Sequence, residues 1–139
     1  MPIVVGDEQV GWASSALVDA LAPALAIGKA CEITTIPSNG RAICAICLAP
    51  DAQSEAQRTA VAAAIVSDLV ADGFIAVRKV RNELVDVGPL AAGFVGPDGT
   101  PLVRLERGAI VPFGIARFGV HVNGWVRDPS SPDDATPAA

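Results

Sequence analysis

Cysteine, histidine and basic residues are scarce in this sequence of 139 residues. Its three cysteines are an odd number at low density, which excludes a disulfide framework and favours free thiols in a reducing compartment. His121 is the single histidine, so any acid–base chemistry by an imidazole would have to use it. The net charge of −5 argues against bulk binding of nucleic acid, which needs clustered positive charge.

Long apolar runs are missing as well. Runs such as Ala60 to Val66, which ends at Ser67, are far short of the roughly 18 residues that a membrane span needs. The N-terminus has no basic segment ahead of a hydrophobic stretch, so a secretory signal is not expected. We therefore expect a cytoplasmic protein whose partners include neither a membrane nor nucleic acid.

The sequence does contain enough apolar material for a core. Hydrophobic residues make up 51% of the chain and charged residues 18%, which suits one packed domain and excludes global disorder. Basic residues concentrate in residues 78–127, where seven bases stand against four acids, whereas residues 128–139 hold three acids and no base. Such a basic region is either a solvated face or a surface for a small anionic ligand or an acidic partner.

Two β-hairpins are predicted in the first half of the chain. Apolar runs at residues 3–5 and 10–13 flank the turn-forming tetrapeptide at residues 6–9. Apolar and β-branched runs at residues 31–36 and 41–48 flank a second turn-forming segment.

Two helices are predicted between and after these hairpins. Apolar residues recur at helical spacing from Ser14 or Ser15 to Gly28, but Pro23 should kink or divide this helix. The clearer helix begins after Ser54, which has the capping-box spacing to Gln57, and ends at Gly73.

The second half of the chain has a β-like pattern. Strands are expected at residues 74–77, 83–87, 102–105 and 110–115, followed by a last apolar run at residues 118–127. Together with the helices, these strands predict an α+β fold with a mixed or antiparallel sheet and two main helices.

Cys44 and Cys47 form a C-x-x-C motif, which can be a redox pair or half of a zinc site. The motif lies in an apolar β-like run, where residues three apart point to opposite faces, and no second pair of ligands is present. This context favours cysteines buried in the core over thiol redox chemistry or zinc binding.

Two short polar motifs stand out between the apolar runs, Arg81-Asn82-Glu83 and Leu105-Glu106-Arg107. An arginine can hold a phosphate or carboxylate with its fork of donors, and a glutamate can orient that arginine or contribute to a metal site. Ordinary surface ion pairs would produce the same pattern, so both interpretations stand.

The run at residues 118–127 has a polar face if it is one continuous strand. His121, Asn123 and Trp125 would then lie on the same side, because side chains alternate along a strand. A histidine that is merely hydrogen-bonded within a sheet is an equal alternative. Asn123 and Gly124 could also form a type I′ turn, which would make the run a hairpin.

These segments together resemble the N-terminal region of a Nudix hydrolase subgroup labelled thiamine pyrophosphokinase-related. In that subgroup a domain of uncharacterised function precedes a Nudix domain that cleaves a diphosphate. The resemblance runs from Pro2 to Arg127 and favours the continuous strand over the hairpin. The motifs that carry it are Arg81-Asn82-Glu83-Leu84, Leu105-Glu106-Arg107 and Gly119-Val120-His121-Val122-Asn123-Gly124-Trp125.

The resemblance implies a domain layout and a set of site residues. Residues 1–117 would be an accessory domain and residues 118–127 the first strand of a truncated Nudix domain. Residues 128–139, rich in proline, serine, aspartate and alanine, are expected from their composition to form a flexible acidic tail or loop. The implied substrate is a small diphosphate similar to thiamine diphosphate or a nucleoside diphosphate. The residues expected to contact it are Arg81, Asn82, Glu83, Arg107, His121, Asn123 and Trp125.

The catalytic part of a Nudix hydrolase is missing from the sequence. No glutamate follows Glu106, so the glutamate-rich Nudix box that would hold Mg²⁺ is not there. We therefore expect no catalytic residue, no metal site and no cofactor in this chain, which alone should be inactive. Its partner would be the missing Nudix domain or another chain. The alternative is a non-catalytic binding or interaction module that pairs through its last strand.

Overall fold

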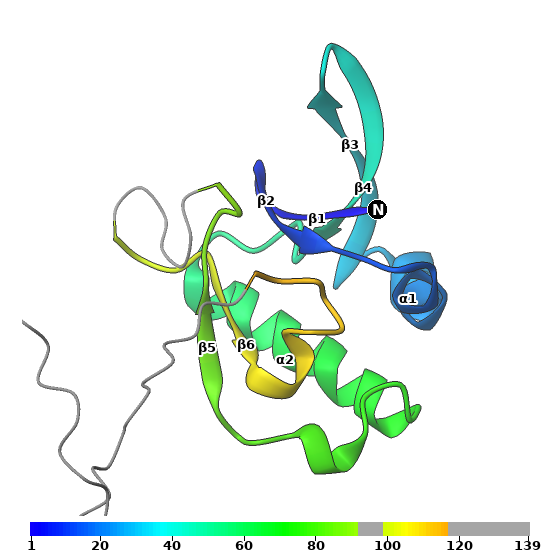
Figure 1. Cartoon of the computed structure of the whole chain (residues 1–139), viewed down its shortest axis with the longest axis vertical. Helices are drawn as coiled ribbons and strands as arrows, with labels where there is room; N and C mark the ends of the chain where they lie inside the picture. Colours follow the sequence, from blue (N-terminus) through cyan, green and yellow to red (C-terminus); the bar gives the residue numbers. More distant parts are fainter. Residues whose placement is uncertain (92–98, 117–139) are drawn as a thin grey trace, which may run out of the picture.

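A computed structural model of the chain describes residues 1–91 and 99–116. These residues form the predicted α+β fold, with two α-helices, a mixed four-stranded sheet and an antiparallel pair of strands (Figure 1). The elements are β1 (Pro2–Val5), β2 (Glu8–Trp12), α1 (Ser15–Ile27), β3 (Cys31–Ser38), β4 (Arg41–Leu48), α2 (Glu55–Ala71), the 3₁₀ turn η1 (Val77–Lys79), β5 (Leu84–Val87), β6 (Val103–Glu106) and the 3₁₀ turn η2 (Arg107–Ala109).

The four-stranded sheet has the order β2-β1-β4-β3 and contains both predicted hairpins. β1 pairs antiparallel with β2, and β3 pairs antiparallel with β4. Asn39 and Gly40 join β3 to β4 with φ angles of 49° and 75°, as a type I′ turn requires. The two hairpins meet where β1 and β4 pair in parallel, which makes the sheet mixed.

Helix α1 is continuous, so the prediction that Pro23 interrupts it is wrong. Proline removes one N–H donor, but both ends of this helix are well capped. The Ser14 hydroxyl accepts a hydrogen bond from the Leu17 N–H at 3.2 Å, and the Gly28 N–H donates to the Ala24 carbonyl at 3.0 Å. Because Leu17 and Leu21 are also buried in the core, packing and capping outweigh the cost of the proline.

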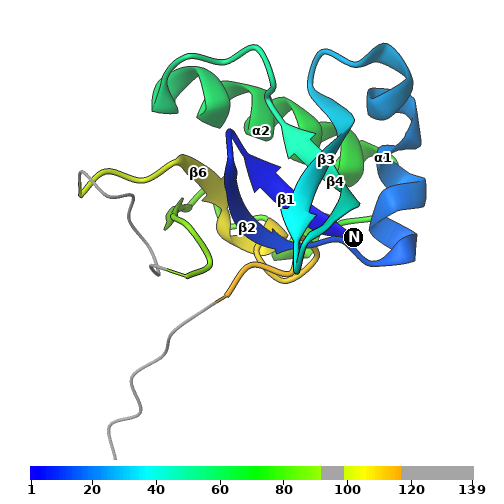
Figure 2. The same cartoon turned by 90° about the horizontal axis from the view of Figure 1, so that it is seen from above.

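Helix α2 confirms the predicted capping box. The Ser54 hydroxyl accepts from the Gln57 N–H, and the Gln57 side chain accepts from the Ser54 N–H, both at 3.2 Å. Helices α1 and α2 both pack on the four-stranded sheet (Figure 2). None of the helices in residues 1–91 and 99–116 is both long and apolar enough to cross a membrane.

Two predicted strands are turns instead. Residues 74–77 follow α2 after Gly73, and the Ile75 N–H donates a hydrogen bond to the Leu69 carbonyl of the helix. The chain then enters η1. Residues 110–115 continue the helical turns of η2, with the Phe113 N–H donating to the Ala109 carbonyl at 3.0 Å. The predicted strands at 83–87 and 102–105 are confirmed as β5 and β6, each starting one residue later.

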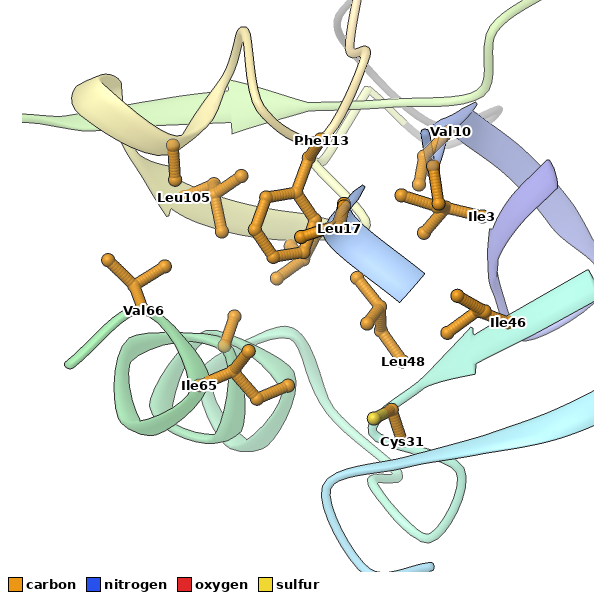
Figure 3. Packing of buried hydrophobic residues seen from close by; sticks show 14 of the residues in the cluster. Ile3, Val10, Leu17, Cys31, Ile46, Leu48, Ile65, Val66, Leu105 and Phe113 are labelled. Atoms are coloured by element: carbon orange, nitrogen blue, oxygen red, sulfur yellow. The ribbon is translucent and has the colours of Figure 1, made fainter. Parts of the chain in front are cut away.

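One large core joins the helices, the four-stranded sheet and the β5–β6 pair (Figure 3). Phe113 lies in its middle at 1% exposure, between Leu105 of β6 and Ile65 of α2 on one side and the sheet on the other. Of the two cysteines predicted to be buried, Cys47 is buried, but the prediction for Cys44 is wrong, because the first four residues of β4 lie outside the core. Cys31 is buried as well.

Several predictions fall outside the described residues. These are the strand at residues 118–127, with His121, Asn123 and Trp125, and the acidic tail at residues 128–139. The proposed start of a Nudix domain and the pairing through the last strand therefore stay predictions.

Candidate functional site

The β5–β6 hairpin brings the two arginine–glutamate motifs together. Leu84 pairs with Glu106, so in this antiparallel hairpin the residues before β5 meet those after β6. The Arg107 N–H donates to the Glu83 carbonyl at 2.9 Å and closes this end, the lower one in Figure 1. Four of the predicted site residues lie at this end of the hairpin: Arg81, Asn82, Glu83 and Arg107.

Glu83 and Arg107 form a close ion pair. The Nη1 atom of Arg107 donates to both carboxylate oxygens of Glu83, at 2.8 Å to Oε2 and 3.1 Å to Oε1. The hydrogen bond to Glu83 raises the pKa of Arg107 above its ordinary value, so the guanidinium stays charged. Both side chains are about half exposed, and such pairs add little to stability. The main effect of the pair is to orient Arg107.

Glu106 connects the segment before β5 to the turn after β6. Its Oε1 atom accepts hydrogen bonds from the Arg81 N–H at 2.8 Å and from the Gly108 N–H at 3.2 Å. Hydrogen bonds from backbone N–H groups to a carboxylate are charge-assisted and therefore stronger than neutral ones. This carboxylate thus fixes the backbone on which Arg81 and Arg107 stand.

The backbone at this end of the hairpin is also packed closely. A Cβ atom at Gly108 would collide with the carbonyl oxygen of Lys79, so η2 lies directly against η1. Asn82 has a φ of 54°, a left-handed conformation that asparagine tolerates better than most residues. The positions of Lys79 and Arg81 therefore depend on unusual local backbone, which is common at functional sites.

A cleft of about 700 Å³ opens between η1, η2 and the segment that precedes β5. Its charged lining residues are all basic: Lys79, Arg81 and Arg107. In the part of the chain that the structure describes, neither Lys79 nor Arg81 forms a salt bridge. The remaining lining residues are Phe74, Ile75, Ala76, Gly108, Val111 and Pro112. We call this site the basic cleft.

The sequence predicts only part of this site. Arg81 and Arg107 line the basic cleft, Glu83 holds Arg107, and Asn82 lies between Arg81 and Glu83. Lys79 was missed as a site residue, although it belongs to the basic run that begins at Arg78. Phe74 and Pro112 were missed too, and no local signal could have identified them because only the folded chain brings them together.

The cysteines do not form a site in the described residues. All three are free, and burial raises the pKa of both the Cys31 and the Cys47 thiols. A reactive or metal-binding cysteine needs a lowered pKa instead. No group of three His, Cys, Asp or Glu side chains within residues 1–91 and 99–116 could hold a metal ion.

Fold and site together define the class of this protein as a small α+β domain with a basic cleft at one end of a β-hairpin. The chain belongs to the family described as a domain of unknown function (DUF4743), whose match covers residues 1–117. A search of the curated proteins found no match. This family is consistent with the N-terminal domain of uncharacterised function that the resemblance implies, whereas the link to Nudix hydrolases stays a prediction.

Proposed function

We propose that this chain is the N-terminal substrate-pocket module of a Nudix-type diphosphatase whose catalytic box lies outside this sequence. The substrate is a small diphosphate, similar to thiamine diphosphate or a nucleoside diphosphate. One observation carries the proposal: the motifs Arg81-Asn82-Glu83 and Leu105-Glu106-Arg107, on which the resemblance rests, meet at the basic cleft.

The cations of the basic cleft suit a diphosphate group. The planar guanidinium of an arginine can donate two parallel hydrogen bonds to phosphate oxygens, and a lysine adds a compact positive charge. Glu83 supports this role because it holds the guanidinium of Arg107 in one orientation. Lys79 and Arg81 form no salt bridge within the described residues, so their positive charge is not neutralised there.

Cleavage belongs to the missing Nudix domain, either in the same gene product or in a partner chain. There, Mg²⁺ held by the Nudix box would neutralise phosphate charge and activate water. This chain contributes binding and orientation, and we expect no hydrolysis from it alone.

Titration calorimetry with pyrophosphate and the Arg81→Met variant tests the binding role. Arg81 lines the basic cleft, so its loss should weaken pyrophosphate binding at least about tenfold, because a hydrogen bond to a charged group is worth roughly 1.5–3 kcal/mol. Arg78→Met is the matched control, because Arg78 is also an exposed arginine but does not line the cleft. No pyrophosphate binding, or equal losses in both variants, would contradict the proposal.

A second experiment addresses the accessory role. The chain is incubated with Mg²⁺ and either thiamine diphosphate or a nucleoside diphosphate, and released phosphate is measured. We expect none, and release would show that the chain is itself a hydrolase. Sequencing the gene beyond Ala139 should reveal a Nudix box in the same or an adjacent reading frame.

A further inference from the structure

The lining of the basic cleft is of two chemical kinds. Lys79, Arg81 and Arg107 supply positive charge, while the lining residues between α2 and η1 and those after η2 are apolar. Phe74 packs against the hydrophobic core, which holds its ring in place. Val111 is 69% exposed, so a ligand that covered it would remove apolar surface from water. The cleft therefore offers contacts for an anion and for an apolar body.

The size of the cleft indicates that the ligand has such a body. Its volume of about 700 Å³ lies in the range of roughly 300–1,000 Å³ that is typical of small-molecule sites. A phosphate or diphosphate group by itself occupies a small part of that volume. The remaining space borders Phe74, Val111 and Pro112, which suit an apolar or aromatic group.

The charges around the cleft determine which body fits. The two nearby carboxylates are already engaged: Glu83 binds the guanidinium of Arg107, and Glu106 accepts two backbone N–H groups. A ring with a positive charge would therefore face Lys79 and Arg81 without a free carboxylate from these two residues to balance it. Repulsion between like charges a few ångströms apart weakens binding measurably even in a partly solvated site.

We propose that the basic cleft takes an organic phosphate or diphosphate whose body carries an uncharged aromatic ring, in preference to one whose body is a cationic ring. This inference rests on the proposed function and deepens it. Of the two substrate kinds implied by the resemblance, it selects the one with an uncharged ring, as in a nucleoside diphosphate, over thiamine diphosphate.

A matched pair of ligands tests the proposal on the unmodified chain. Thiamine diphosphate carries a cationic thiazolium, and 3-deazathiamine diphosphate has the same shape with an uncharged ring. Calorimetry should show that the uncharged compound binds about five- to tenfold more tightly at low salt, and that the difference shrinks as salt screens the charges. It should also bind more tightly than pyrophosphate, because its body covers apolar surface.

A variant that adds a carboxylate to the cleft provides an independent test. Val111→Glu should reduce or reverse the preference for the uncharged compound, since the new charge would attract the thiazolium. Val77→Glu is the matched control: Val77 is 73% exposed, and the substitution changes the net charge equally, but Val77 does not line the cleft. This control should keep the preference of the unmodified chain.

The outcomes separate this inference from the proposed function. If pyrophosphate and both diphosphate compounds fail to bind, the proposed function and the inference are both wrong. If pyrophosphate binds but thiamine diphosphate binds as tightly as its uncharged analogue, only the inference is overturned. The same holds if the uncharged analogue binds no better than pyrophosphate.

Discussion

Glu106 accepts a hydrogen bond from the Arg81 N–H at 2.8 Å, and this bond links the two sides of the basic cleft. The same oxygen accepts from the Gly108 N–H at 3.2 Å. Arg81 precedes β5 and Gly108 follows β6, so one carboxylate oxygen connects backbone segments that are distant in sequence. The distance between the cationic side chains of the cleft depends on this connection.

Replacing Glu106 should loosen both sides of the cleft together. In Glu106→Ala the amides of Arg81 and Gly108 lose their acceptor, and their hydrogen exchange, followed by NMR, should become about fivefold faster for a lost bond of roughly 1 kcal/mol. The affinity of this variant for pyrophosphate should also fall. Glu106→Gln keeps an oxygen at this position and should restore most of the protection. Unchanged exchange at both amides in the alanine variant would show that the carboxylate does not hold them.

Gly114 should be far less tolerant of alanine than Gly6. Both have a left-handed backbone, with φ angles of 56° and 59°, which costs an alanine about 1–2 kcal/mol. At Gly114 the new Cβ would also collide with the carbonyl oxygen of Trp12, whereas at Gly6 it meets nothing within 4 Å. Urea unfolding should therefore show that Gly114→Ala loses at least ~1 kcal/mol more stability than Gly6→Ala. Equal losses would mean that the close approach to β2 is unimportant.

The three thiols should differ in reactivity towards a thiol reagent at pH 8. Exposed Cys44 should react at once, whereas buried Cys31 and Cys47 should react only on unfolding. Burial, with Cys47 nearby, raises the pKa of Cys31 above its ordinary value of 9.0, and burial followed by the charge of Glu32 does the same for Cys47.

The two thiols have higher pKa values in the folded than in the unfolded state, so folding favours their neutral form. Their contribution to the free energy of unfolding is fully present below pH 9 and is lost as the pH rises through the folded-state pKa values. Stability should therefore fall as the pH rises above about 9. Cys44→Ser should remove the fast reaction, and Cys47→Ala should reduce the pH dependence of stability. Three thiols reacting equally fast in the folded chain would contradict the burial of two of them.

Local rules predicted most of the secondary structure. Asn39-Gly40 is a strong type I′ signal, and Ser54 with Gln57 forms a capping box, because both depend only on residues a few positions apart. The errors have non-local causes. Pro23 is tolerated because the helix around it packs against the core, and the apolar run at residues 110–115 is a set of turns because it inserts Phe113 between α2 and the sheet.

The candidate site was only partly visible in the sequence. The two arginine–glutamate motifs stand out as short polar segments, but their meeting depends on the register of β5 and β6. The participation of Phe74 and Pro112 depends on the packing of three segments around one cleft. Periodicity and spacing carry no information about such contacts.

Near-neighbour patterns in the amino-acid sequence are sufficient to predict the α+β class, both N-terminal hairpins, the capped helix α2 and the concentration of basic residues after residue 77. These features depend on hydrogen bonds and side-chain patterns between near neighbours. That Lys79, Arg81 and Arg107 share one cleft with an apolar lining follows from the folded chain alone. That arrangement depends on a strand pairing and a carboxylate that join distant segments, and such contacts form only when the whole core is packed.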